Sequence, residues 1–328
     1  MLERLKLAKY RFVLEAIEPM GLPPYKGAVL RGGFGHAFKR MACLQPGGIC
    51  DVCQERTRCA YSYVFETPVP PDSEVLRTHE AVPRPFVFEP PLDGKTVYEP
   101  DDELAFGLVL IGRGIDYLPY FILAFKALGE EGLGQGRGRF RLKQVWAGDP
   151  LGPWETLIYD GPSDALRNVA MAAGMADIER AAGVLSERDI IIHFLTPTEI
   201  KHDDRIVHEP AFHMLIRALL RRISSLSYFH CGERWEIDYK GLIAKAQMVD
   251  IVESALTWQN WGRFSGRQER RIEMGGVIGR LRFAGSLADF RPLLLMGSVV
   301  HVGKACVFGN GQYVMADTCA NRPAFSTV

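Results

Sequence analysis

The sequence GSVVHVGKACVFGNGQY, residues 297–313, decides how we interpret the fold of the whole chain. Lys304 lies among its four glycines, which are Gly297, Gly303, Gly309 and Gly311. Glycine permits positive φ and close approach of a backbone to a ligand, and successive N–H groups in such a turn form an anion site. A lysine adds a positive charge for phosphate. We therefore expect a phosphate-contacting loop before a final strand, although a glycine-kinked hairpin without a ligand accounts for the spacing equally well.

Two common nucleotide-binding motifs do not explain this loop. Ala305 follows Gly303 and Lys304, so the triphosphate-binding pattern G-x-x-x-x-G-K-[ST] is absent. The dinucleotide fingerprint G-x-G-x-x-G at the start of a helix is absent as well.

The composition is that of a globular protein with two domains. Its 328 residues are many for a single compact core, and 47% of them are hydrophobic. There is no apolar run long enough to span a membrane, and the charged start MLERLKLAKY is unlike a signal peptide. We expect a cytoplasmic protein without a membrane partner, whose cysteines are thiols or metal ligands rather than disulfides. A net charge of zero argues against a nucleic-acid binder, but local basic clusters keep that function open.

The hydrophobic pattern of residues 1–150 predicts a ferredoxin-like β-α-β-β-α-β unit. Its expected elements are a strand at 5–17, a helix at 27–41, short strands at 63–68 and 85–90, a strand at 104–111, a helix at 117–128 and a strand at 140–146.

Residues 187–316 repeat that order. We expect a strand at 188–196, a helix at 210–229, a strand within 242–261, a kinked hairpin at 272–283, a helix at 287–296 and a last strand after the glycine stretch. Residues 151–186 are predicted to be a linker, because Gly-Pro pairs interrupt them, and residues 317–328 a tail. The fold class is thus α+β, with two tandem ferredoxin-like (RRM-like) domains.

Four cysteines follow the first predicted helix, at Cys43, Cys50, Cys53 and Cys59. The C-x2-C pair and the irregular loop suit a tetrahedral structural zinc site. An iron–sulfur cluster, a disulfide-closed loop and a metal-free loop are the alternatives. Four thiolates fill a coordination shell, so we expect no catalytic metal there.

His36 and Lys39 lie three residues apart on the first predicted helix and therefore share a face. A lone histidine on a helix is more often structural or solvated than catalytic. The spacing alone does not assign a function to this pair.

Six short segments, taken in order, carry a family resemblance. They are LRGGFGH at 30–36, CAY at 59–61 with VFE at 64–66, GQGR at 134–137, TPT at 196–198, SGRQ at 265–268, and GK at 303–304 with GNG at 309–311. In these segments the chain resembles the precursor-crRNA-processing endoribonucleases of CRISPR systems, members of the RAMP superfamily. The resemblance implies two ferredoxin-like domains and metal-independent cleavage of CRISPR repeat RNA to mature crRNA. The 2′-hydroxyl would attack the adjacent phosphodiester and leave a 2′,3′-cyclic phosphate.

The same resemblance implies roles for individual residues. Family members often place a histidine in or beside the first helix, and His36 matches this position as the general base. Tyr25 and Lys39 are candidates for the leaving-group acid and the phosphate clamp. Alternatives are Lys26 or Arg31 as the clamp, and His230 or His301 as the histidine.

RNA is expected in a cleft between the domains, reached by both His36 and the C-terminal glycine loop. The expected RNA contacts are Arg31, Arg137, Arg139, Arg267, Arg270, Gly297, Gly303, Lys304, Gly309 and Gly311. For about half of the arginines, solvated surface is the alternative explanation.

Three other functions compete with the nuclease. The first is a non-catalytic RNA-binding subunit of a CRISPR effector complex, with other effector subunits as its partners; such a subunit needs no histidine at position 36. The second is a metalloenzyme with its chemistry at the cysteines, which a filled four-thiolate shell disfavours. The third is a zinc-stabilised structural domain.

Overall fold

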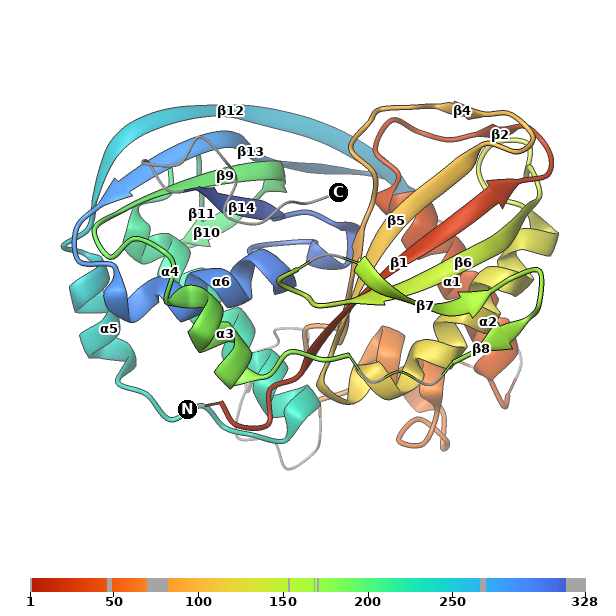
Figure 1. Ribbon diagram of the computed structural model, residues 1–328, viewed down its shortest axis with the longest axis horizontal. Coiled ribbons are helices and arrows are strands. Elements are labelled where there is room, and N and C mark those ends of the chain that lie inside the picture. Colours follow the sequence, from red (N-terminus) through yellow and green to blue (C-terminus); the bar gives the residue numbers. More distant parts are fainter. Residues whose placement is uncertain are drawn as a thin grey trace.

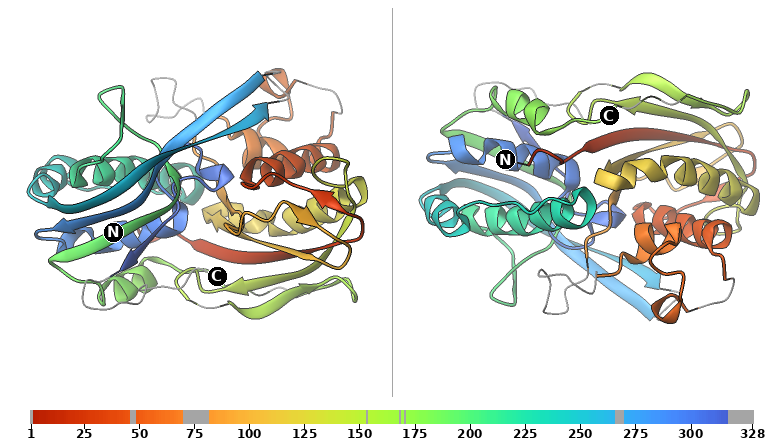
Figure 2. Two further views of the ribbon diagram at one scale, coloured as in Figure 1. Left: turned by 90° about the horizontal axis from the view of Figure 1, so that it is seen from above. Right: turned by 90° about the horizontal axis from the view of Figure 1, so that it is seen from below.

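The computed structural model describes residues 2–45, 49–69, 82–152, 154–167, 169, 171–265 and 270–316, without the side chains of 154–155, 263–265 and 270–273. Two α+β halves lie side by side, each a sheet with helices on one face (Figure 1). Seen from below in Figure 2, α1 and α2 (orange-red and yellow) and α4 (teal) lie in front of the strands. Two ferredoxin-like units are therefore confirmed. No described helix is long and apolar enough to cross a membrane.

The first half contains an antiparallel sheet with the order β3-β5-β1-β6, extended by β7 and β8. Its strands are β1 (Leu7–Ala16), β3 (Phe86–Glu89), β5 (Glu103–Ile111), β6 (Phe140–Gly148), β7 (Trp154–Asp160) and β8 (Ala165–Leu166), its helices are α1 (Gly27–Ala42) and α2 (Leu118–Glu131), and β2 (Met20–Gly21) pairs separately with β4 (Val97–Tyr98).

Alternation along β1 decides which face of this sheet the helices cover. Tyr10, Phe12 and Leu14 are buried in the core beneath α1 and α2. Successive side chains of a strand point to opposite faces, so Lys9 and Arg11 lie on the other, open face.

Helix α1 is held to the sheet by one apolar stripe. Leu30, Phe34 and Phe38 recur every fourth residue and are buried. Phe34 stacks on Phe121 of α2, with 4.3 Å between the ring centroids. The remaining faces of α1 are free to carry functional side chains.

The second half repeats the arrangement, with the sheet order β14-β9-β13-β12. Its strands are β9 (Asp189–Thr198), β12 (Asp250–Ser265), β13 (Arg270–Ala284) and β14 (Tyr313–Ala316), its helices are α3 (Met175–Ala182), α4 (Phe212–Leu226), α5 (Tyr239–Ala246) and α6 (Arg291–Val300), and a small hairpin joins β10 (Ile200–His202) to β11 (Arg205–Val207). The long β12–β13 hairpin (light blue) reaches across to α1 of the first half (Figure 2).

Two predicted elements of the fold are wrong. Residues 63–68 are not a strand, because Ser62–Glu66 is a helical turn. Tyr61, just before this turn, stacks on Phe65 with 5.2 Å between the ring centroids. Residues 272–283 belong to the single strand β13, and Gly279, at φ +113°, lies at a register shift rather than at a turn. The strand predicted within 242–261 is confirmed as β12, which begins at Asp250, and the residues before it include the end of helix α5.

The predicted linker, residues 151–186, is also wrong. Strand β7 pairs with β6 and so widens the first sheet. Ile178 and Ala182 of α3 are buried in the core of the second half. The Gly-Pro pairs interrupt the segment without separating it from either sheet.

His230 joins the two halves. It is fully buried, and its Nε2 donates a hydrogen bond to the carbonyl oxygen of Pro83 at 2.7 Å. Its Nδ1, 3.1 Å from the Tyr63 hydroxyl, then accepts a hydrogen bond from it. Burial lowers the pKa of His230 to about 4, so the ring is neutral at pH 7.

Candidate active site

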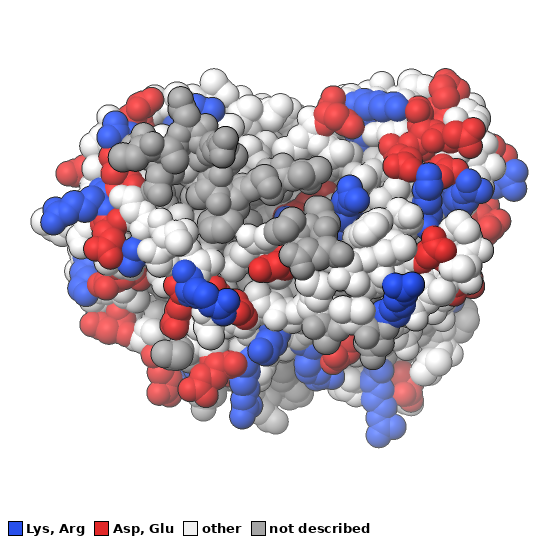
Figure 3. Space-filling view, in the orientation of Figure 1, with Lys and Arg blue, Asp and Glu red and all other residues white. Residues whose placement is uncertain are grey.

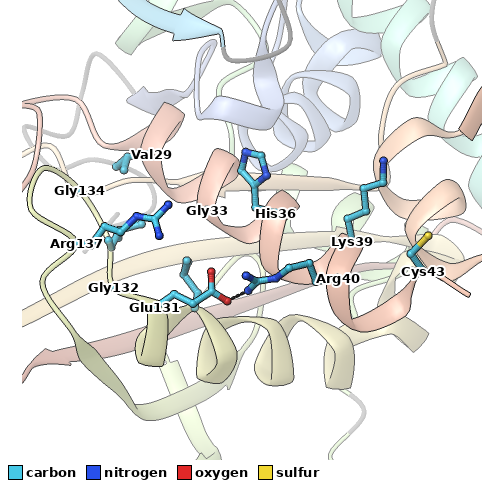
Figure 4. A pocket seen from close by; sticks show the side chains of 12 residues that line it. Val29, Gly33, His36, Lys39, Arg40, Cys43, Glu131, Gly132, Gly134 and Arg137 are labelled. Atoms are coloured by element: carbon cyan, nitrogen blue, oxygen red, sulfur yellow. Dashed lines mark ion pairs between the residues drawn. The ribbon is translucent and has the colours of Figure 1, made fainter. Parts of the chain in front are cut away.

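A pocket of about 620 Å³ opens between α1 and the loop that follows α2 (Figure 4). Helix α1 and its end contribute Val29, Gly33, His36, Lys39, Arg40 and Cys43, and the other wall consists of Leu128, Glu131, Gly132, Leu133, Gly134 and Arg137.

The spacing along α1 places His36 in this pocket. Residues 29, 33, 36, 40 and 43 follow one another at intervals of three or four and lie on one face, away from the buried Phe34 and Phe38. The His36 ring is exposed and points outward from the helix (Figure 4). Gly33 allows close packing here, because a Cβ would lie 2.8 Å from the Leu128 side chain.

The opposite wall is a glycine-rich loop with a fixed shape. Gly132, Gly134 and Gly136 have φ of +80°, +77° and +83°, and Arg137 itself has φ +52°. A Cβ on Gly132 would overlap the carbonyl oxygen of Arg137, and one on Gly134 would overlap that of Gly21. These close approaches require glycine, and they hold the backbone of Arg137 across the pocket from His36.

The pocket has an excess of positive charge. Its one acid, Glu131, forms an ion pair with Arg40 (Figure 4). Among the described residues, Lys39 and Arg137 have no such partner, and the Lys39 ammonium lies 5.7 Å from the centroid of the Tyr61 ring. Two uncompensated cations favour an anionic ligand, and a histidine beside them can accept or donate a proton.

The C-terminal glycine loop does not share this pocket, so the expectation of a common cleft is wrong. No residue of 297–313 lines it. The loop docks instead on the first turn of α1, where a Cβ on Gly27 would overlap the carbonyl oxygen of Phe308. Nine residues separate Gly27 from His36, which at about 100° per residue puts them on opposite sides of the helix.

The glycines of this loop serve contacts within the protein. Gly303, Gly309 and Gly311 have φ of +87°, +91° and +75°, and a Cβ on each would overlap Glu199, Pro90 and Val302 respectively. Gly297 is not in the loop: it lies inside α6, against Leu219 and the hydroxyl of Tyr313. Lys304 pairs with Glu199 at 3.2 Å.

Tyr25 is part of the loop contact and lies outside the His36 pocket. Its hydroxyl is 3.0 Å from the Phe308 carbonyl oxygen and 3.3 Å from Oδ1 of Asn310, and its ring lies 4.5 Å from that of Trp261. Burial raises the pKa of Tyr25 far above its ordinary value. Tyr25, predicted as the leaving-group acid, is therefore partly buried in a contact with the second half.

The alternative clamps and histidines are also engaged elsewhere. The guanidinium carbon of Arg31 lies 4.0 Å from the centroid of the Phe65 ring and 4.9 Å from that of Phe308. Lys26 is buried and pairs with Asp93 at 3.1 Å. His230 and His301 are fully buried. His36 is thus the one candidate histidine of the sequence analysis that faces solvent.

The remaining predicted RNA contacts are four arginines, at positions 137, 139, 267 and 270, which differ in their surroundings. Arg139 is bound by Glu18 at 2.8 Å. Arg270 lies in β13, where its side chain is not described, and Arg267 lies outside the described residues. Of the predicted arginines whose side chains are described, only Arg137 lines the pocket with His36.

The four-cysteine zinc site is not supported. Cys43, Cys50, Cys53 and Cys59 do line one small pocket and are all free thiols. The described residues nevertheless contain no group of three or more His, Cys, Asp or Glu side chains that could hold a metal ion. The thiol of Cys43 donates instead to the carbonyl oxygen of Gln45 at 3.1 Å. The sequence spacing of the four cysteines is that of a metal site. Their thiols are nevertheless not arranged as a ligand shell for zinc or for an iron–sulfur cluster.

Three residues of the pocket were not predicted as site residues from the sequence: Arg40, Glu131 and Gly132. Arg40 follows His36 by four residues, which is a signal for a shared helix face. Glu131 and Gly132 gave no signal, because only the tertiary fold brings the end of α2 to α1.

Two family models match the chain. Residues 5–171, slightly more than half of it, match the AF_1859 N-terminal domain, and residues 192–313 match the CRISPR-associated endoribonuclease Cas6. An uncharacterized protein of Archaeoglobus fulgidus is 26% identical over 294 residues, which covers 89% of this chain and 92% of that protein.

Solved structures share the fold. A Cas6 product complex has a TM-score of 0.55 at 16% identity and covers 94% of this chain and 99% of its own. Cas6 of Thermus thermophilus has a TM-score of 0.52 at 14% identity, with coverage of 95% and 99%. At these identities the likeness establishes the arrangement of elements and leaves the chemistry to the side chains of this chain.

Proposed function

Because the chain belongs to the Cas6-type RAMP family of CRISPR-associated proteins, we propose that it is an endoribonuclease that cleaves CRISPR repeat RNA. The observation that carries this proposal is the exposed ring of His36, which shares a pocket with Lys39 and Arg137. An RNA-binding subunit without catalysis has no use for a solvent-facing histidine between two cations.

The reaction we propose is an internal transesterification. His36 takes the proton of a 2′-hydroxyl, whose oxygen attacks the adjacent phosphorus. The bond from phosphorus to the 5′-oxygen breaks, and that oxygen takes up a proton from solvent as it leaves, while His36 returns its own proton to solvent. The products are a 2′,3′-cyclic phosphate and a free 5′-hydroxyl, so no water is consumed and the charge is balanced.

Lys39 and Arg137 would stabilise the crowded phosphate. Both lie in the pocket with His36 and are uncompensated among the described residues. Charge-assisted hydrogen bonds to such an oxyanion are worth about 1.5–3 kcal/mol each. Because side chains supply the base and the cations, we propose that the reaction needs no metal. The other subunits of a CRISPR effector complex are the proposed protein partners.

The test is cleavage of end-labelled repeat RNA in the presence of EDTA. We expect a product with a cyclic phosphate end. His36→Ala should reduce cleavage at least a hundredfold and leave RNA affinity within about threefold, because it removes the base and keeps both cations. His213→Ala, on the partly exposed start of α4, is the matched control.

Binding without cleavage by the wild-type protein would favour the alternative, a non-catalytic RNA-binding subunit. Full cleavage by His36→Ala would place the base elsewhere.

A further inference from the structure

A second pocket lies on the other side of the first sheet, where the two halves meet. It measures about 280 Å³ and is lined by Lys9, Arg11, Glu89, Pro90, Pro91, Leu92, Ala105, Phe106, Gly107, Leu195 and Gln312. Lys9 and Arg11 belong to the open face of β1, opposite the face that α1 and α2 cover. This pocket is therefore separated from His36 by the sheet and by a helix layer.

Two side chains of this pocket each have a buried polar atom without a hydrogen-bond partner in the described part of the chain. Gln312 is 6% exposed, and its Oε1 is buried without a hydrogen bond. Nε of Arg11 is buried without one as well. Among the described residues no acid pairs with the Arg11 guanidinium, whose carbon lies 5.9 Å from the centroid of the Trp146 ring. An unsatisfied buried polar atom costs about 1–3 kcal/mol, which a ligand that supplies the missing partner recovers.

The other charged groups of the pocket satisfy one another. Glu89 lies 2.9 Å from the Lys9 ammonium and 3.3 Å from Nε2 of His301. Burial by itself raises the pKa of Glu89, but Lys9 and His301 outweigh it and hold that pKa at about 2. Arg11 and Gln312 are thus the groups left for a ligand.

Glutamine and arginine side chains recognise purine bases by paired hydrogen bonds. The amide of a glutamine pairs with N6 and N7 of adenine, and the guanidinium of an arginine pairs with O6 and N7 of guanine. Pro90, Leu92 and Leu195 supply apolar walls for a flat ring. Pyrimidines have no N7, so neither side chain can form this pair of hydrogen bonds with a pyrimidine base.

The second sheet adds a contact for the RNA backbone. Leu195 lines the pocket, and His193, two residues earlier on β9, lies on the same face. Its cross-strand partner, Arg280, is exposed and has no ion pair within the described residues. On the face shown in Figure 3, basic and acidic side chains are interspersed rather than gathered into a broad basic surface. Arg280 is therefore a candidate for a single phosphate contact.

We propose that the pocket between the two sheets binds one unpaired purine base of the substrate RNA through Gln312 and Arg11. The inference rests on the proposed function, which supplies the RNA, and assigns to it a specificity site remote from the cleaved bond. Bases outside a duplex are the usual targets of sequence-specific RNA readers, because their edges are free.

The test measures binding in the His36→Ala background, where no RNA is cleaved. The probes are fluorescent uridine dodecamers, either unmodified or with one central adenine, guanine or cytosine. We expect the two purine-containing probes to bind at least fivefold more tightly than the other two. Gln312→Leu and Arg11→Leu should each reduce this preference to less than twofold, with thermal midpoints measured to establish folding. Arg180→Ala, an exposed arginine on α3, is the control for a lost charge.

Each outcome decides the proposal. A purine preference that persists in both folded variants overturns it, as does equal affinity for all four probes. Competition by 5′-AMP or 5′-GMP without any preference among the dodecamers would assign the pocket to a free nucleotide and reject the RNA site. Failure of the wild-type protein to cleave repeat RNA would refute the nuclease and leave this binding test unaffected.

Discussion

The position of Arg137, and not merely its presence, should control the rate of cleavage. Gly132→Ala tests this without changing an ionisable group. Gly132 has φ +80° and ψ 162°, a conformation essentially restricted to glycine, so alanine costs on the order of 1–3 kcal/mol there. Its Cβ would also overlap the carbonyl oxygen of Arg137, so the loop must shift. Misplacement of a catalytic contact by about 1 Å reduces a rate roughly a hundredfold.

Gly136→Ala is the matched control for that variant. Gly136 has φ +83°, so alanine is strained there as well, but nothing lies within 4 Å of its Cβ. Single-turnover cleavage at saturating RNA is the assay, with thermal midpoints measured beside it. We expect both variants to lose stability, and a rate at least about thirtyfold lower in Gly132→Ala alone. Equal rates in the two variants would mean that the loop does not place a catalytic group.

Three further predictions concern the core, the joint between the halves and the RNA contacts. Phe34→Ala should cost about 3–5 kcal/mol of unfolding free energy in chemical denaturation, because it empties the ring stack between α1 and α2. His230 has a pKa of about 4 when folded and an ordinary value when unfolded, so the unfolded state binds the extra proton as the pH falls below 6.5. Stability should therefore fall by about 2 kcal/mol between pH 7 and pH 5, and His230→Gln should remove most of that slope. Lys39→Ala and Arg137→Ala should each lower the slope of log affinity against log salt by about 0.7, and an unchanged slope would exclude a phosphate contact.

The sequence predicted the parts of the fold that local periodicity determines. The four-residue repeat of Leu30, Phe34 and Phe38 fixes α1, and alternation fixes β1. The sequence did not predict the parts of the fold that depend on tertiary contacts. Residues 62–66 form a helical turn within an aromatic cluster, and residues 154–160 form a strand that pairs with β6. Periodicity measures the burial of a face and does not record which partner covers it.

The candidate site was predictable only along one helix. His36 and Lys39 share a face because of their spacing, whereas the second wall comes from the end of α2, about a hundred residues later. The four cysteines illustrate the reverse error. Their spacing is that of a metal site, but Cys43 directly follows the end of α1, and its thiol donates a hydrogen bond to the carbonyl oxygen of Gln45.

The C-terminal glycines have a packing role within the protein, and RNA contact by their loop stays a prediction. Their loop connects the halves through a chain of contacts: Tyr25 to Asn310, the Asn310 carbonyl oxygen to His301 at 3.1 Å, and His301 to Glu89. Because the loop docks on the first turn of α1, it fixes the helix that carries His36 relative to the second half. The loop that the sequence predicts to contact phosphate therefore also connects the two halves. The same loop borders the pocket of Gln312, so one rigid segment sets the relative positions of the proposed cleavage site and the proposed base-reading site.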